Sequence, residues 1–580
     1  MSELINVKID NILVSVEKGT TILDAAKIAG IKIPTLCYLK DINAIGACRV
    51  CVCEVKGARA LVAACVYPLE REGTEVFTNS PKILQSRKTT VELMLSDHEQ
   101  NCPSCVRNQN CELQKLAYEL GCDTKKYLGA RIEYSIDEST PYLVRDNNKC
   151  ILCRRCVAAC TAYQSVSVIG ANGRGFDTHI SSAFEKLLGD VACVGCGQCI
   201  TVCPTGALRE RDEIDEVLAD ISNPDKYVIV GTAPATRVGI GEEFGYPIGT
   251  NCEGKMVAAL RRIGFNNVFD VDFTADLTIM EEGYEFLGRL KNGGKLPMMT
   301  SCSPAWIKFI EHNYPEFIGN LSSCKSPQQM FGALCKTYYA SKIGVPAEKI
   351  SVVTIMPCTA KKFEKNRPFQ NAAGVQDIDH VLTTRELARL IKRKGILFNE
   401  LSDEQYDSPL GIGSGAGLLF GATGGVMEAA LRTLAEVIEG KELKNLDFKD
   451  VRGVQGIKEA KYTLAGIEVK VAVASGLGNA RNLLELIKAG KADYHFIEIM
   501  SCPGGCVNGG GQPIQDAFTR NNSNIQALRA KAIYDTDKVM KLRKSHENVY
   551  IKELYDTFLG EPNSHKAHEI LHTKYVKRDL

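Results

Sequence analysis

The sequence has only one tryptophan, no apolar run of about 18 residues and almost no net charge. A run of that length is what a membrane-spanning helix requires, so we expect no such helix. The first eight residues contain no basic stretch followed by a long apolar segment. We therefore expect no signal peptide and predict a cytoplasmic location. The formal net charge of +1 argues against a surface built for nucleic acid.

Cysteine, in contrast, is abundant. The chain contains 24 cysteines, and seventeen of them precede residue 210, mostly in short-spaced groups. In a long chain without a secretion signal, metal ligation explains such groups better than disulfides do. Soft thiolates at these spacings bind iron–sulfur clusters or zinc. At 580 residues the chain is also too long for a single core, so we expect several domains.

Residues 1–80 are predicted to form a domain that holds a two-iron cluster. Alternation over residues 5–10 and 13–17, with a turn at Asn11 and Ile12, indicates a β-hairpin, and Thr21 opens a helix that Gly30 ends. The cysteine spacing resembles that of plant-type two-iron ferredoxins with a β-grasp fold. The matching residues are Cys37, Cys48, Cys51 and Cys65. A zinc ribbon is the alternative, although it usually shows two close pairs. Cys53 is off the pattern and is interpreted as a structural thiol.

Residues 81–140 contain one histidine and three cysteines within one short block. The four residues are His98, Cys102, Cys105 and Cys111. Taken alone, this set also fits a structural zinc site. Following a two-iron domain, however, the block resembles the four-iron segment of iron–iron hydrogenases, which the large iron–sulfur subunit of respiratory complex I shares. A neutral histidine ligand in place of a thiolate is expected to raise the potential of that cluster.

Residues 141–210 contain the strongest single motif, two successive runs of four cysteines. The runs are Cys150, Cys153, Cys156, Cys160 and Cys193, Cys196, Cys199, Cys203, and the second is followed by Pro204. This is the pattern of bacterial two-cluster ferredoxins, in which the fourth cysteine of each run ligates the other cluster. We therefore assign Cys203 to the first cubane and Cys160 to the second. Thr161 stands where the first run usually has proline.

From residue 211 onwards, short apolar strands alternate with helical stretches, which predicts an α/β domain over residues 211–580. Strands are expected at 227–231 and 351–355, and a helix at 255–263. The glycine string 411–417 is weak evidence for a nicotinamide cofactor, because no proper first strand precedes it. We interpret it, together with Phe420–Met427, as a loop against a compact cofactor that enters a helix at Glu428.

Three short segments carry the family resemblance. They are Thr300–Trp306, Met356–Glu364 and the glycine-rich Met500–Gln512. We expect the glycines of the last segment to let the backbone press against a bulky inorganic group. The three segments resemble the signature loops of iron–iron hydrogenases, and the order of the upstream cysteine motifs resembles that of the large clostridial type. The resemblance covers nearly the whole chain.

The resemblance implies an H-cluster, which is a four-iron cubane joined to a two-iron unit carrying carbon monoxide, cyanide and an azadithiolate. Cys358, Cys502 and Cys506 match three of its four cubane cysteines, with Cys506 at the bridging position. The fourth falls on Ser303. Three interpretations stay open: a Ser303 oxygen ligand, which we favour, a shift of Cys302 to the cubane, or water on the fourth iron. An alkoxide is harder and more basic than a thiolate.

The resemblance also implies a proton relay that runs through Glu285, Ser322, Glu282 and Cys302, with Arg289 at its outer end. Without the resemblance, two glutamates three positions apart would be interpreted as a solvated helix face. Lys361 matches a lysine that hydrogen-bonds a cyanide ligand, whereas its neighbour Lys362 is expected at the surface. The pocket walls are expected to include Ala233, Pro234, Gln328, Met356, Phe420 and Met500.

We therefore expect a multidomain α+β and α/β protein with one two-iron cluster, three four-iron clusters and an H-cluster. The implied activity is reversible reduction of protons to H2, with electrons from ferredoxin or a similar one-electron carrier. Separate maturation proteins are expected to install the two-iron unit, and the chain is expected to be a monomer. Two alternatives stay open: a subunit of an electron-bifurcating complex fed by a flavoprotein, and a hydrogen sensor with weak activity because of Ser303.

Overall fold

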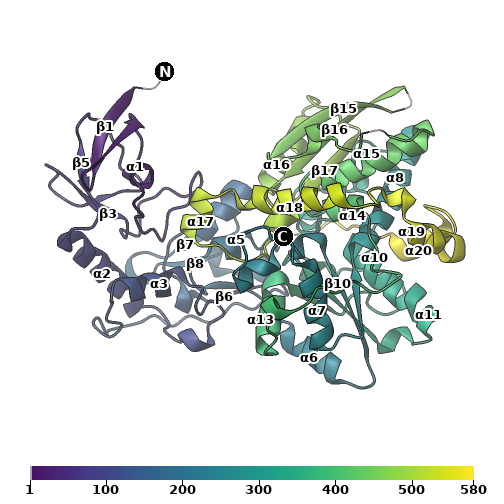
Figure 1. Cartoon of the computed structure of the whole chain (residues 1–580), viewed down its shortest axis with the longest axis horizontal. Helices are drawn as coiled ribbons and strands as arrows, with labels where there is room; N and C mark the ends of the chain where they lie inside the picture. Colours follow the sequence, from purple (N-terminus) through teal and green to yellow (C-terminus); the bar gives the residue numbers. More distant parts are fainter. Residues whose placement is uncertain (1–2, 444, 465, 580) are drawn as a thin grey trace.

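The computed structural model describes residues 3–443, 445–464 and 466–579. Figure 1 shows the N-terminal segments at one end of an elongated molecule and a larger mass of sheets and helices at the other. In the part of the chain that the structure describes, no helix is long and apolar enough to cross a membrane.

The N-terminal segment folds into a five-stranded sheet with the order β2-β1-β5-β3-β4. Its strands are β1 (Leu4–Ile9), β2 (Ile12–Glu17), β3 (Val52–Val55), β4 (Val62–Ala63) and β5 (Glu75–Phe77), and α1 (Ile22–Ile28) packs against it. The predicted turn was wrong by one residue. Asp10 and Asn11 occupy it with φ of 44° and 69°, values that a β-branched residue such as Ile12 avoids. The predicted N-cap at Thr21 is confirmed.

The cysteine-rich middle of the chain is built from short elements joined by long loops. They are α2 (Pro81–Ser96), α3 (Glu112–Glu119), β6 (Leu143–Arg145), α4 (Arg155–Ala158), β7 (Gly170–Asn172), β8 (His179–Ser181), α5 (Gln198–Val202) and β9 (Leu208–Glu210). β6 pairs with β9, and β7 with β8. Cysteine side chains contribute to the core of this region, alongside large apolar residues such as Tyr142, Ile180 and Ile200.

The remainder of the chain is built around two four-stranded sheets. The first, in the order β11-β10-β13-β14, is wholly parallel and contains β10 (Tyr227–Thr232), β11 (Asn267–Asp270), β13 (Ile350–Met356) and β14 (His380–Thr383). The second, in the order β12-β17-β16-β15, contains β12 (Met298–Met299), β15 (Ile457–Leu464), β16 (Ile467–Ser475) and β17 (Phe496–Met500). β12, β17 and β16 are parallel to one another, and β15 is antiparallel to β16.

Helices cover both sheets. They are α6 (Ile214–Ser222), α7 (Glu253–Ile263), α8 (Asp272–Asn292), α9 (Pro304–Asn313), α10 (Pro327–Leu334), α11 (Ala340–Ile343), α12 (Lys361–Glu364), α13 (Thr384–Arg393), α14 (Gly415–Leu419), α15 (Gly425–Glu439) and α16 (Leu477–Lys488). The C-terminal helices are α17 (Ala517–Asn522), α18 (Ile525–Val539), α19 (Val549–Leu554) and α20 (His565–Leu571). In Figure 1 these last helices, drawn in yellow, run across the molecule from the N-terminal end to the far side.

The strands predicted at 227–231 and 351–355 and the helix at 255–263 are confirmed within one to two residues. The predicted long loop up to Glu428 was wrong. Ser414 caps α14 by accepting hydrogen bonds from Ala416 and Gly417, so a short helix forms inside the glycine string. The next helix, α15, already begins at Gly425.

Candidate functional site

Four parallel strands end at one place, and each is followed directly by predicted site residues. β10 leads into Ala233 and Pro234, and β13 leads into Cys358. From the other sheet, β12 leads into Cys302 and Ser303, and β17 leads into Cys502. The carboxyl ends of parallel strands are where open α/β sheets place their ligand sites, because the loops that follow them meet there. Chain topology thus joins segments that lie up to 270 residues apart.

Cys358, Cys502 and Cys506 face one another. Burial raises the pKa of the Cys502 thiol to about 12, and the neighbouring Cys358 contributes to that rise. Burial also raises the pKa of Cys506, with Cys502 and Cys358 as the next causes. Such a set costs free energy as free thiolates and is stabilised when a cationic metal centre neutralises it. The donor set therefore fits a metal cluster.

Ser303 lies beside these thiols, at the start of α9. Its hydroxyl oxygen is 2.7 Å from the hydroxyl oxygen of Ser501 and accepts a hydrogen bond of 3.2 Å from the Ser501 N–H. The Ser303 side chain therefore faces the loop that carries Cys502. Ser303, which the resemblance aligns with a fourth cysteine ligand, thus directs its hydroxyl at the same loop.

The glycines of the segment 500–512 pack against protein backbone. A Cβ at Gly509 would lie 2.0 Å from the Pro357 carbonyl oxygen, and one at Gly510 would lie 2.2 Å from the Cys196 carbonyl oxygen. Gly505 has φ of +96°, which L side chains rarely adopt. At Gly509 and Gly510 the missing side chain lets three loops touch. Contact of the glycine-rich segment with an inorganic group stays a prediction.

The predicted relay residues are brought together along α8. The Ser322 hydroxyl donates to Glu285 Oε2 at 2.9 Å, and Arg289 donates to Glu285 Oε1 at 2.6 Å. Glu282 is buried, and one of its carboxyl oxygens has no hydrogen-bond partner. Burial raises the pKa of Glu282 to about 8, and the charge of Glu285 adds to the rise. Burial raises the pKa of the Cys302 thiol, with Glu282 as the next cause, so the two groups are neighbours.

Lys361 lies at the first position of α12 and reaches across to the loop after β12. Its ammonium donates to the Cys302 carbonyl at 3.1 Å, to the Ser326 hydroxyl at 2.8 Å and to Glu364 at 2.8 Å. The expectation that Lys362 is a surface residue was wrong. Lys362 is fully buried and pairs with Glu386 at 3.0 Å, which removes the cost of burying its charge.

The predicted wall residues are all buried. They are Ala233, Pro234, Gln328, Met356, Phe420 and Met500. Gln328 accepts a hydrogen bond from the Thr354 hydroxyl and donates to Glu364, so its amide is fixed beside the Lys361 ammonium. Met356 and Met500 are the last residues of β13 and β17, so their thioethers lie where the two sheets meet the site.

Two small cavities in the middle region are each lined by four of the predicted cluster cysteines. One is lined by Cys150, Cys153, Cys156 and Cys203, and the other by Cys160, Cys193, Cys196 and Cys199. The groups are the crossed sets predicted from the two runs, because the last cysteine of each run folds back beside the other run. Burial raises the pKa of the Cys160, Cys196 and Cys199 thiols in the second set.

The remaining predicted ligands lie nearer the N-terminus. Cys51 Sγ and Cys65 Sγ are 3.4 Å apart, and Cys37 and Cys48 are hydrogen-bonded neighbours. His98 is buried with Nδ1 unpartnered, and burial lowers its pKa to about 4, so its imidazole is neutral, as a ligand must be. Cys105 is close to Cys111 and contributes to the raised pKa of the Cys111 thiol. Cys102 is the first residue of the short turn Cys102–Ser104, which precedes Cys105 in the chain.

A single zinc ion holds its ligand atoms about 3.3–3.8 Å apart, given bonds of about 2.0–2.3 Å in tetrahedral geometry. Among the described residues, the groups of three or more candidate ligand atoms that lie within 4.8 Å of one another are Glu285–Cys324–His572 and Glu436–His546–Glu547. Neither belongs to the predicted cluster sets.

Cys324 and His572 were not predicted. Cys324 is buried two positions after Ser322, and that proximity to a relay residue was the available signal. His572 comes from the C-terminal segment, and its Nδ1 lies 2.8 Å from the Ser323 hydroxyl, 249 residues away in the chain. Nothing in the sequence pattern indicates that contact.

Comparison with protein families matches successive parts of the chain. Residues 226–510 match "Iron only hydrogenase large subunit, C-terminal domain", and residues 523–578 match "Iron hydrogenase small subunit". The chain belongs to the iron-only hydrogenases. Upstream, residues 2–81 match a 2Fe-2S iron–sulfur cluster binding domain, residues 87–126 the NADH-ubiquinone oxidoreductase-G iron–sulfur binding region, and residues 149–207 a 4Fe-4S dicluster domain.

Full-length relatives agree with this assignment. "NADP-reducing hydrogenase subunit HndD" of Solidesulfovibrio fructosivorans is 49% identical, with 99% of each chain covered. "Iron hydrogenase 1" of Clostridium pasteurianum is 43% identical, covering 98% of this chain and 99% of the relative. Among solved structures, an FeFe-hydrogenase studied for stepwise H-cluster assembly is 43% identical with a TM-score of 0.57, covering 64% of this hydrogenase and 100% of its own chain.

Proposed function

We propose that this hydrogenase interconverts 2H+ + 2e− and H2, with ferredoxin or a similar one-electron carrier as its donor. The observation that carries the proposal is the meeting of two features at the strand ends. One is the set of three facing thiols with the Ser303 hydroxyl beside them. The other is the line of protonatable groups that leads from Glu285 to the Cys302 thiol.

Cys358, Cys502, Cys506 and an oxygen of Ser303 would hold the cubane of an H-cluster, with Cys506 as the bridge. When bound, that cofactor supplies the redox chemistry and the site at which protons and electrons combine. The Lys361 ammonium would donate a charge-assisted hydrogen bond to an anionic ligand such as cyanide. Met356, Met500 and Phe420 would exclude water around it.

The proton path runs inward from the Arg289–Glu285 pair, whose side chains are 17% and 13% exposed. Ser322 is the intermediate group on this path: its hydroxyl donates to Glu285 Oε2, and it is close enough to Glu282 to lower the pKa of that carboxyl. With a pKa of about 8, Glu282 can hold a proton at neutral pH and release it to a stronger base. The Cys302 thiol, kept protonated by burial, is the last carrier before the cofactor.

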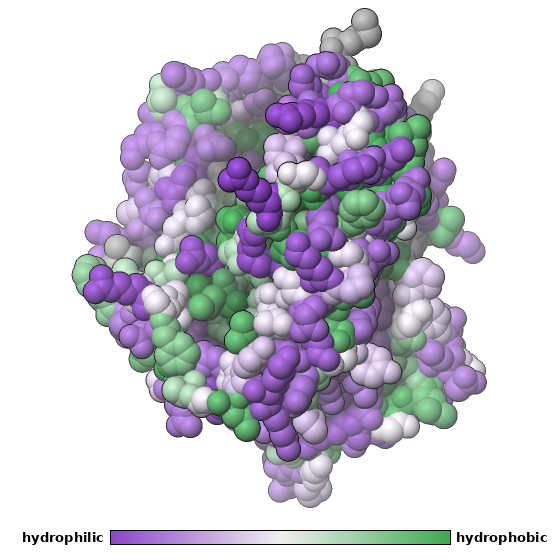
Figure 2. Space-filling model, turned by 90° about the vertical axis from the view of Figure 1, so that its left-hand side faces the viewer, coloured by the Kyte–Doolittle hydropathy of each residue, from purple (hydrophilic) through white to green (hydrophobic). Residues whose placement is uncertain are grey.

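Electrons would enter through the domains at 1–80, 81–140 and 141–210, which would hold one two-iron and three four-iron clusters, and would reach the catalytic domain at 211–580. The close contact between the Cys196 loop and Gly510 is where the chain of clusters would meet the H-cluster. Figure 2 views the N-terminal end of the molecule and shows hydrophobic groups broken up by hydrophilic ones. A surface of that kind suits transient encounters with a soluble carrier.

A second candidate function has a specific observation behind it. The relative that is 49% identical over 99% of both chains is described as a subunit of an NADP-reducing hydrogenase. This chain would then exchange electrons with a partner subunit that handles the nicotinamide, since its own glycine string forms helix α14 and no nucleotide loop is expected there.

The two functions separate by donor and by assembly. For the purified, matured chain alone, we expect carbon monoxide and cyanide bands in the infrared and H2 evolution from reduced methyl viologen and from reduced ferredoxin. Evolution with NADPH only after a partner subunit is added, together with co-migration in one complex, would favour the second function. Absence of the infrared bands after maturation would overturn both.

A further inference from the structure

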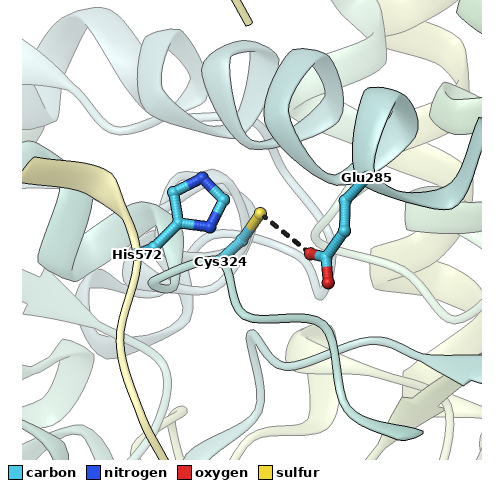
Figure 3. A group of neighbouring side chains, drawn as sticks. All are labelled: Glu285, Cys324 and His572. Atoms are coloured by element: carbon cyan, nitrogen blue, oxygen red, sulfur yellow. Dashed lines mark hydrogen bonds between the residues drawn. The ribbon is translucent and has the colours of Figure 1, made fainter. Parts of the chain in front are cut away.

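Glu285, Cys324 and His572 form a compact group of three potential metal ligands. One ligand atom from each lies within 4.8 Å of the other two. Figure 3 shows the Cys324 sulfur between the imidazole and the carboxylate, with all three side chains directed toward one another. They come from α8, from the loop before α10 and from the segment after α20. Neither Cys324 nor His572 has a role in the proposed proton path.

Backbone pairing fixes two of the three ligands. Cys324 and His572 are opposite one another in an isolated antiparallel bridge. On either side of it, Lys325 N–H donates to the Leu571 carbonyl and Thr573 N–H donates to the Ser323 carbonyl, each at 2.8 Å. Residues directly opposite in such a pair extend their side chains on the same side. The sulfur and the imidazole therefore approach one another because of the backbone.

The imidazole of His572 is held in the orientation that metal-binding histidines adopt. Its Nε2 is 3.0 Å from a carboxyl oxygen of the fully buried Glu281. That carboxylate is fixed in turn by the Tyr555 hydroxyl and the Asn563 N–H. When one ring nitrogen donates a hydrogen bond to a carboxylate, the other nitrogen is left for a metal and becomes more basic. The nitrogen left here is Nδ1, whose hydrogen-bond partner within the described part of the chain is the Ser323 hydroxyl.

The two carboxylate oxygens of Glu285 have different hydrogen-bond partners. Oε1 accepts a hydrogen bond of 2.6 Å from Arg289. Oε2 is directed inward, where it accepts from the Ser322 hydroxyl at 2.9 Å and lies 3.7 Å from Cys324 Sγ. That last distance already equals the spacing of about 3.3–3.8 Å between two ligands of one tetrahedral zinc ion.

We propose that Glu285, Cys324 and His572 form a binding site for Zn2+ that shuts the proton path. The ligands are one thiolate sulfur, one imidazole nitrogen and one carboxylate oxygen, the donor types that zinc prefers, with water in the fourth position. Binding breaks the Cys324 S–H bond, forms a zinc–sulfur bond and releases the thiol proton to solvent, without change of oxidation state. The thiolate and carboxylate then balance the charge of the ion.

Inhibition follows from the double use of Glu285. Oε2 is the oxygen that accepts from Ser322, so a bound ion removes it from the path toward Glu282. This consequence rests on the proposed function, whereas the binding itself does not. Zinc is therefore expected to lower the rate of H2 evolution and to leave the iron–sulfur clusters unchanged.

A second group of similar composition provides a comparison within the same chain. Glu436, His546 and Glu547 also lie within 4.8 Å of one another. In that group the Lys544 ammonium pairs with Glu436 at 2.7 Å and with Glu547 at 3.0 Å, and no thiol is present. A lysine thus already occupies the space between the carboxylates, and we expect no zinc there.

The binding test uses the intact holoenzyme dialysed against zinc chloride, with metal analysis and zinc-edge X-ray absorption. Cys324→Ser and His572→Gln should each bind one zinc ion fewer per chain than the wild type and should lack the zinc–sulfur distance. His546→Gln and Cys122→Ala, which alter the comparison group and a thiol outside every proposed ligand set, should match the wild type. Equal zinc content in the wild type and Cys324→Ser would overturn the site.

The inhibition test measures H2 evolution from reduced methyl viologen as zinc is added. The wild type should be inhibited and should recover with a chelator, and Cys324→Ser should need at least tenfold more zinc for the same inhibition. If zinc binds at the sulfur-containing site but does not slow H2 evolution, the result supports the site and shows that Glu285 is not part of the proton path. The same zinc sensitivity in Cys324→Ser as in the wild type would overturn the claim that this site shuts the path.

Discussion

At the residue scale, the protonation of Glu282 is the property most exposed to a test. Burial raises its pKa to about 8, and the charge of Glu285 contributes. Below pH 8 the Glu282 carboxyl is protonated and can donate its proton, and above pH 8 it is ionised and has no proton to donate. We therefore expect the rate of H2 evolution to fall as pH rises through about 8, measured with methyl viologen at fixed driving potential.

The matched variants for this prediction are Glu282→Gln and Glu285→Gln. Glu282→Gln keeps the shape and cannot exchange the proton, so the rate should fall by about 10²–10⁴-fold while the infrared bands of the cofactor remain. In Glu285→Gln the rate of H2 evolution also falls. The pH at which the residual activity declines should move to a lower value, because the charge of Glu285 no longer raises the pKa of Glu282. A wild-type rate in Glu282→Gln would contradict the relay.

Ser303 gives a second prediction at this scale. If its oxygen completes the cubane, Ser303→Cys replaces a harder and more basic ligand with a thiolate. We expect a shifted cubane spectrum and a changed reduction potential in an electrochemical titration, with H2 turnover retained because Cys302 is untouched. Ser301→Cys is the control, since the Ser301 hydroxyl donates to the Cys324 carbonyl and not to the loop that carries Cys502. Unchanged spectra and turnover in Ser303→Cys would show that Ser303 has no part at the cluster.

At the scale of elements, the contact between the Cys196 loop and the glycine-rich segment decides how close two clusters can come. Gly197 and Gly510 meet backbone to backbone, because a Cβ on either would overlap the other loop. The Thr359 hydroxyl donates to the Gly195 carbonyl and the Gln198 amide donates to the Asn508 carbonyl, which hold the loops in register.

Gly510→Ala tests this contact. The added methyl group would lie 2.2 Å from the Cys196 carbonyl oxygen, so the loops must separate, at a cost of about 1–3 kcal/mol in the free energy of unfolding. We expect H2 evolution driven by ferredoxin to fall several-fold, measured beside thermal stability. Gly129→Ala is the control, because nothing lies within 4 Å of its Cβ position. A ferredoxin-driven rate equal to that of the control would show that the contact does not limit electron transfer.

At the scale of the whole molecule, the cluster-bearing segments and the catalytic part are separable in principle. Solved FeFe-hydrogenases that match 64% of this chain over 100% of their own length lack counterparts to the rest. The N-terminal segments are therefore expected to conduct electrons and to contribute little to the chemistry.

Removal of residues 1–210 should leave a protein that evolves H2 from methyl viologen within about tenfold of the intact rate, because a small dye can reach the H-cluster site directly. Ferredoxin-driven evolution should fall much further. Iron analysis should show a loss of about 14 iron atoms per chain, the content of one two-iron and three four-iron clusters. Equal ferredoxin-driven rates in the two proteins would place the entry point of electrons elsewhere.

The sequence alone predicted much of this arrangement, and its failures have two causes, one local and one tertiary. Cysteine spacing predicted the crossed sets that line the two cavities, since three members of each set lie within one short stretch of the chain. The hairpin turn was misplaced by one residue, because alternation does not mark which residues tolerate positive φ. Lys362 was expected at the surface, yet Glu386 from another element pairs with it in the core.

What the sequence determined by itself is the chemistry of each short segment: which loops carry thiols, at what spacing, and which family they belong to. Those features are local, because ligand spacing is set within a few residues of the chain. Only the tertiary structure decided that Glu285, Cys324 and His572 meet. Backbone hydrogen bonds pair the segments of Cys324 and His572, and the Glu285 side chain reaches them from helix α8. The same holds for the contact of Gly197 with Gly510, which depends on two loops packing without side chains between them.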